Sequence, residues 1–99
     1  MLLLPATLTA LEALATQRLL AQAVKLESAM DVTVDASQLK LFDSAALAVL
    51  LECRRVATAL GRSFQVRDMP PKLMALANLY GVSVLLNETS PSVETALNQ

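Results

Sequence analysis

Apolar and polar residues alternate in two segments of the chain, and this pattern predicts β-strands with one buried face. The clearest segment is DVTVD at residues 31–35, and RSFQVRDM at residues 62–69 follows the same rule. Two shorter apolar runs, LLL at 2–4 and VSVLL at 82–86, predict a first and a last strand. Pro5 follows the first run and has no N–H to donate, which is typical of a short edge strand. The side chains predicted to point inward are Val32, Val34, Phe64 and Val66.

Three segments between these strands have the features of helices. Thr9 and Glu12 form a capping-box pair, which predicts a helix from this point to about Lys25 or Glu27. Its apolar positions approximate one face: Leu11, Leu14, Ala15, Leu19 and Ala23. A second helix is predicted over Ala45–Leu60, ended by Gly61, with apolar residues around most of its circumference. A third is predicted over Lys72–Leu79, with Pro71 near its first turn and Gly81 closing it.

Strands and helices therefore alternate, and such an order is typical of an α/β fold with a small, mostly parallel or mixed sheet, here of four strands with three or four helices. The length of 99 residues favours one domain spanning residues 1–99, in which 87–99 form a polar tail or a weak terminal helix. In parallel sheets ligands bind beyond the carboxyl ends of the strands, where helices begin. Asp43 and Ser44 lie at that edge.

The composition narrows the classes of partner. The chain is 55% hydrophobic and 17% charged, which is rich in apolar residues for its size and suggests that part of this material faces a partner. A net charge of −1 and 3% aromatic residues argue against nucleic-acid binding. A total of two glycines and the absence of a GxxxxGK[ST] motif argue against nucleotide binding by the chain itself.

The chemistry available to an enzyme is restricted as well. The sequence has no histidine and one cysteine, Cys53, which excludes histidine-based catalysis and a disulfide within the chain. We expect no metal and no cofactor. The apolar N-terminus lacks the basic region of a signal peptide, and no apolar run is long enough to span a membrane, so we expect a cytoplasmic protein.

The ordered set of motifs resembles a known family. The run FDSAALAVLL at residues 42–51, after an alternating strand and before a glycine-terminated helix, resembles the STAS domain, whose pattern is Asp-Ser-x-Gly-Leu at the start of a long helix. The segment MPPKLMALANLYGVSVLL at residues 69–86 is similar to the MlaB type of STAS protein. One position departs from the pattern, because Ala46 stands where the family usually has glycine.

The resemblance implies a function. MlaB-type proteins are non-enzymatic cytoplasmic subunits of the ABC transporter that moves phospholipids to maintain outer-membrane lipid asymmetry, and they bind its ATPase subunit. We expect this chain to contact an ATPase, and through it the permease, so that it reaches the inner membrane only through the complex. The residues expected at the contact are Phe42, Asp43, Ser44, Ala45, Pro71, Lys72, Leu73, Leu76 and Tyr80.

Three alternatives stay open at this stage. Ser44 could be an ordinary N-cap, with Asp43 as a charge that complements the helix dipole. The chain could be an anti-sigma-factor antagonist that is regulated by phosphorylation of Ser44, with the phosphate stabilised by the N–H groups at the helix start. It could also be a small enzyme with Ser44 or Cys53 as nucleophile, although only Lys40 is near enough in sequence to act as a base. A homodimer is a further expectation for the isolated protein.

Overall fold

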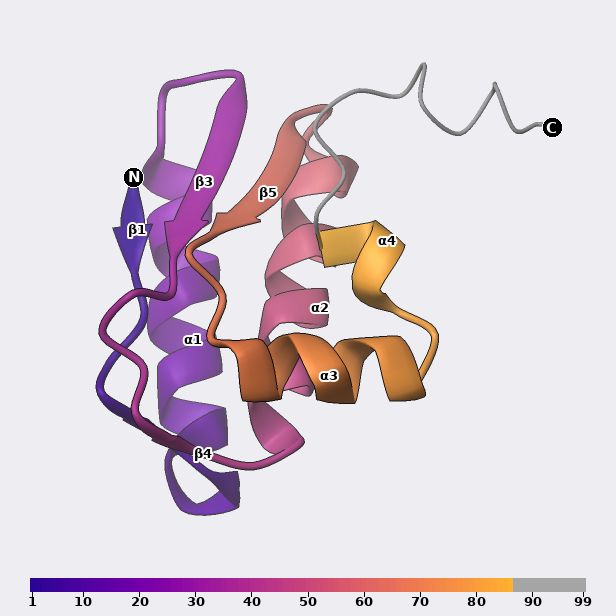
Figure 1. Ribbon diagram of the computed structural model, residues 1–99. Coiled ribbons are helices and arrows are strands. Elements are labelled where there is room, and N and C mark those ends of the chain that lie inside the picture. Colours follow the sequence, from indigo (N-terminus) through magenta and orange to yellow (C-terminus); the bar gives the residue numbers. More distant parts are fainter. Residues whose placement is uncertain (87–99) are drawn as a thin grey trace, which may run out of the picture.

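The computed structural model describes residues 1–86, and its centre is a parallel three-stranded sheet in the order β1-β3-β5 (Figure 1). These strands are β1 (Leu2–Leu3), β3 (Asp31–Asp35) and β5 (Ser63–Arg67). A second sheet consists of two short parallel strands, β2 (Thr7–Leu8) and β4 (Leu41–Phe42). The predicted tail or terminal helix at 87–99 lies outside the described residues.

The central strand β3 sets the register of the main sheet. It pairs with β1 on one side and β5 on the other, and Val34 lies opposite both Leu2 and Val66. Paired residues of parallel strands share a face, so the predicted inward valines and Phe64 line the buried side. The opposite side is polar: the Ser63 hydroxyl donates to Asp31 at 2.6 Å.

Helices α1 (Ala10–Leu26) and α2 (Ala45–Ala59) lie side by side on one face of this sheet (Figure 1). The predicted bounds of both helices are confirmed to within about two residues. The inward face of α1 differs from the stripe that the sequence suggested. Leu20 and Val24 are its buried residues, whereas most of the predicted stripe is exposed to solvent: Leu11, Leu14, Ala15 and Leu19.

Glycine ends the second and third helices, as predicted. After α2, Gly61 has a φ of 75°, and the Arg62 N–H donates to the Ala57 carbonyl at 3.0 Å. After α3 (Pro71–Leu79), Gly81 has a φ of 73°, and the Val82 N–H donates to the Ala77 carbonyl at 2.9 Å. Both ends are Schellman motifs, which need a left-handed residue that glycine supplies without strain.

The predicted last strand at 82–86 is wrong, because Ser83–Leu86 forms the short helix α4. The Leu85 N–H donates to the Val82 carbonyl at 3.0 Å, which starts the helical turn. Leu86 is fully buried. The end of the apolar run is therefore buried as the sequence suggested, but it packs against the core as a helical turn and does not pair as a strand. Within the described residues, the main sheet consequently has three strands rather than four.

Over residues 1–86 the architecture is α/β with parallel strands and four helices, consistent with the STAS-like fold expected from the sequence. Among residues 1–86, no helix is both long and apolar enough to cross a membrane.

Two neighbouring leucines test the orientation of α1. Leu20 is 7% exposed and Leu19 is 74% exposed, so Leu20→Ala leaves a cavity and Leu19→Ala does not. We expect Leu20→Ala to lower the free energy of unfolding by about 2–5 kcal/mol, and Leu19→Ala to change it by about 0.5 kcal/mol or less. Urea unfolding of the two variants measures this. Equal losses would place both leucines in the core and contradict the observed orientation.

Candidate functional site

The candidate site forms where the two long helices begin. Strand β2 leads directly into α1 and strand β4 leads directly into α2, and the two strands pair with Thr7 opposite Leu41 and Leu8 opposite Phe42. The Ala6 carbonyl adds hydrogen bonds from the Lys40 and Leu41 N–H groups at 2.8 and 3.0 Å. This small ladder fixes the two helix starts next to one another.

Asp43 connects the two helix starts. One carboxylate oxygen, Oδ1, accepts from the Ala45 N–H of α2 at 2.8 Å. The other, Oδ2, accepts from the Ala10 N–H of α1 at 3.2 Å. Each N–H belongs to a first helical turn and has no partner inside its own helix. The negative charge also lies at the positive end of both helix dipoles. Asp43 is thus a shared cap for α1 and α2.

The start of α1 has its own capping group in addition. Glu12 accepts from the Thr9 N–H at 2.8 Å and from the Thr9 hydroxyl at 2.6 Å, which confirms the predicted capping box. These hydrogen bonds, first the one from the side chain of Thr9, lower the pKa of Glu12 below its usual value. The carboxylate is therefore committed to the α1 start and is not available as an acid–base group.

Ser44 stands at the N-cap position of α2 but does not act as the cap. Its backbone is already helical, with a φ of −64° and a ψ of −15°, and its side chain makes no capping hydrogen bond. The residue is exposed, and within residues 1–86 its hydroxyl has no hydrogen-bond partner. The expectation that Ser44 caps α2 is wrong, because Asp43 accepts the hydrogen bond from the first helical N–H. The Ser44 hydroxyl therefore remains available to solvent or to a partner.

The N–H groups of the first turn of α2 are all occupied. Asp43 accepts from Ala45 through its carboxylate and from Ala46 through its carbonyl, at 2.8 and 3.0 Å. The Ser44 carbonyl accepts from Leu47 at 3.0 Å and from Ala48 at 3.4 Å. A phosphate on Ser44 would thus have to displace an existing hydrogen bond and would stand beside the Asp43 carboxylate. Ala46, at the family's glycine position, is fully buried in an ordinary helical turn.

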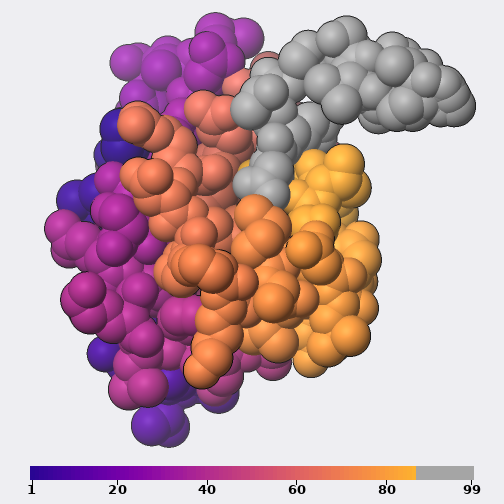
Figure 2. Space-filling view, in the orientation of Figure 1, coloured from indigo at the N-terminus to yellow at the C-terminus, as the bar shows by residue number. Residues whose placement is uncertain are grey.

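The third helix supplies the second group of predicted contact residues. It follows the carboxyl end of β5, and Figure 2 shows α3 and α4 in orange to yellow on the viewed face of the molecule. Pro71 and Lys72 are exposed, and Tyr80 is 58% exposed. Leu73 is 0% exposed and belongs to the core, so it is not available for a contact in this fold.

The remaining apolar residues of α3 also differ in their exposure to solvent. Leu76 is half-buried and packs against the core. Leu79, which the sequence analysis did not single out, is 75% exposed and is the more accessible leucine. The spacing along the helix explains why Leu76 is less exposed than Leu79. Leu73 and Leu76 share a face with the buried Ala77. Phe42 and Ala45 at the other group are half-buried.

Cys53 lies in the middle of α2 and is fully buried. Burial, and secondarily the charge of Glu52, raises the pKa of the Cys53 thiol to about 12. A thiol in this state is not a nucleophile near neutral pH. Residues 1–86 also contain no cluster of three or more histidine, cysteine or acidic side chains that could hold a metal ion.

A family model described as "Mlab, STAS domain" matches residues 2–87. The match covers most of the chain, and the protein belongs to the STAS domain family, in the group that the model describes as Mlab. No curated protein matches the chain significantly.

The shared cap predicts different costs for two adjacent substitutions. We expect Asp43→Ala to lower the free energy of unfolding by about 1–2 kcal/mol, because it leaves two helix-start N–H groups without their acceptor. Ser44→Ala removes no internal hydrogen bond and should cost about 0.5 kcal/mol or less. Urea unfolding compares them, and Asp43→Asn, which keeps an acceptor oxygen, is the control. A larger loss for Ser44→Ala than for Asp43→Ala would make Ser44 the cap.

Thiol labelling tests the state of Cys53. At about pH 8, the raised pKa and the burial should make the folded protein react with a disulfide reagent on the order of a thousandfold more slowly than the protein in urea. Rapid labelling of the folded protein would show an accessible thiolate and revive the nucleophile hypothesis.

Proposed function

We propose that the protein is a non-enzymatic, cytoplasmic STAS subunit of an ABC phospholipid transporter of the Mla type, and that it acts by binding the ATPase subunit. The start of α2 at Asp43–Ser44 and the segment from Pro70 to Tyr80, which contains α3, form the contact. The membership of the family supports this proposal, together with one observation at the site.

That observation is the division of roles between Asp43 and Ser44. Because Asp43 caps both helices, the Ser44 hydroxyl is exposed and has no hydrogen bond within residues 1–86 to lose when a partner arrives. A rigid, pre-formed helix start lowers the ordering cost of binding. The exposed side chains of Lys72, Leu79 and Tyr80 offer a charge, an apolar surface and an aromatic anchor on the second segment.

Binding of this kind regulates the ATPase through a difference in affinity. If the subunit binds one conformation of the ATPase more tightly than another, it stabilises that conformation by the same free-energy difference. The chain needs no cofactor, nucleotide or metal for this role. The alternative, an anti-sigma-factor antagonist, is favoured by the exposed Ser44 hydroxyl, but it requires a phosphate next to Asp43 at a helix start without spare N–H groups.

A pull-down from the native host tests the proposal with a charge introduced at the site. The wild-type protein should retain an ABC-transporter ATPase, and Ser44→Glu should weaken this retention by about tenfold or more, because it adds bulk and charge at the contact. Ser28→Glu, at another exposed serine in the connection between α1 and β3, is the matched control and should bind like the wild type.

Two results would contradict the proposal. If the wild-type protein instead retains a serine kinase of the anti-sigma type and acquires phosphate on Ser44, the antagonist role replaces the transporter role. If the ATPase is retained equally by wild type and Ser44→Glu, the contact lies elsewhere on the surface.

A further inference from the structure

The outer side of α1 carries an apolar ridge that no described residue covers. Leu11 is 92% exposed, Leu19 is 74% exposed and Leu26 is 77% exposed. Positions 11, 15, 19, 22 and 26 recur at intervals of three or four residues and so follow one side of a helix. We call these residues the α1 ridge: Leu11, Ala15, Leu19, Gln22 and Leu26. Exposed leucines in such a row usually mark a binding surface.

Two cations follow one edge of the ridge. Residues 11, 18 and 25 are seven apart, so Arg18 and Lys25 lie almost in line with Leu11. Both are exposed, and neither forms an ion pair within residues 1–86. The two acids of this region, Glu12 and Glu27, are engaged at the ends of the helix: one in the capping box, the other 3.9 Å from the amino group of Met1.

The acid of the neighbouring helix α2 does not offset the positive charges of Arg18 and Lys25. On α2, Glu52 forms a salt bridge with Arg55, which neutralises it. From residue 13 to residue 26, α1 therefore carries two cations and no acid, although the whole chain has a net charge of −1.

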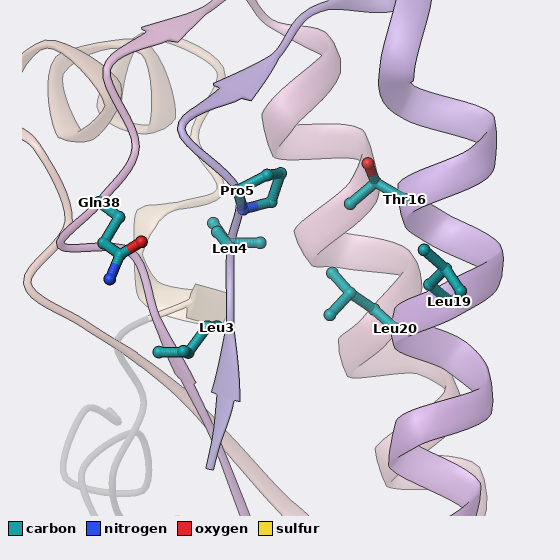
Figure 3. Close-up of a pocket in the computed structure, with 7 residues that line it drawn as sticks. All are labelled: Leu3, Leu4, Pro5, Thr16, Leu19, Leu20 and Gln38. Carbon is teal, nitrogen blue, oxygen red and sulfur yellow. The ribbon is translucent and has the colours of Figure 1, made fainter.

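A groove continues the apolar surface on the other edge of the ridge. Figure 3 shows it between the N-terminal segment and α1, with Leu4 and Pro5 on one side and Leu19 and Leu20 on the other. Thr16 and Gln38 also line it, and its volume is about 350 Å³. Leu3 is itself exposed and belongs to the edge strand of the sheet. Leu19 belongs to both the ridge and the lining of the groove, and so connects the two.

We propose that this side of α1 binds the surface of a bilayer that contains anionic phospholipid, independently of the contact at Ser44. The leucines of the ridge enter the boundary between headgroups and acyl chains, and Arg18 and Lys25 bind phosphate groups. Their long aliphatic stems reach past the ridge while the charged ends stay at the headgroups. The helix lies in the plane of the surface, since its other side is fixed to the core by Leu20 and Val24.

The charge pattern disfavours a second copy of the chain as the occupant. Two α1 helices that pack antiparallel about a two-fold axis would meet with the same edge against the same edge. Arg18 of one copy would then face basic side chains of the other without an acid between them, and like charges in an interface are unfavourable. Anionic lipid supplies the opposite charge along the whole edge.

Vesicle flotation with the full chain tests the proposal. Vesicles of equal parts phosphatidylglycerol and phosphatidylcholine should carry the wild-type protein, and pure phosphatidylcholine vesicles should carry much less. The double variant Arg18→Glu/Lys25→Glu should bind the anionic vesicles about thirtyfold or more weakly, because two attractive charges become repulsive. The double variant Leu11→Gln/Leu19→Gln should also bind the anionic vesicles more weakly. Lowering the salt concentration should not restore its binding, because the lost contribution is apolar and not electrostatic.

Matched controls come from another surface. Lys72→Glu and Leu79→Gln remove an exposed cation and an exposed leucine on α3 and should float like the wild type. Thermal unfolding checks that the variants remain folded, as substitutions at exposed positions predict. Ser44→Glu should float normally, so failure of this proposal is distinct from failure of the transporter assignment.

Three outcomes would overturn the proposal: flotation no greater with anionic than with zwitterionic vesicles, equal loss in the α3 controls, or light scattering that shows a dimer which Leu11→Gln/Leu19→Gln converts to a monomer. The last result would assign the ridge to a second copy of the chain.

Discussion

The structure depends on a constraint of parallel strands. Each step from β1 to β3 to β5 adds a strand in the same direction across the sheet, and each needs a helix to return the chain to its starting edge. Because such crossovers are right-handed, both helices must lie on the same face. Neither of these two crossover helices covers the other face, which is polar, as the pair Asp31–Ser63 illustrates. Among residues 1–86, the same constraint leaves the outer side of α1 without a further layer.

Local signals in the sequence were sufficient for much of this fold. The alternation of DVTVD and of residues 63–67, the capping box of Thr9, and the glycines that end α2 and α3 each specify a conformation through neighbouring residues, and all are observed. The STAS resemblance, which rested on the order of these segments, is confirmed by the family match.

The features that the sequence could not reveal depend on distant partners. Strands β2 and β4 have two residues each and therefore no period to recognise. Helix α1 has leucines on opposite sides, so its periodicity alone does not identify the side that meets the sheet. The second hydrogen bond of Asp43, which makes it a cap of α1 as well, comes from the N–H of Ala10, 33 residues away along the chain. Leu73 was predicted to contact a partner because the sequence shows that a residue is apolar but not whether it is buried.

Helices α1 and α2 are tied together at both ends, and this has a consequence for how the molecule fluctuates. Asp43 holds the two starts, and at the far end the Arg62 guanidinium, just beyond α2, donates to the Val24 carbonyl of α1 at 2.6 Å. Neither helix can fray at one end without losing a bond to the other. Their amide protons should therefore exchange with solvent as one cooperative unit, and a ligand that pulls on the start of α2 transmits the strain to α1.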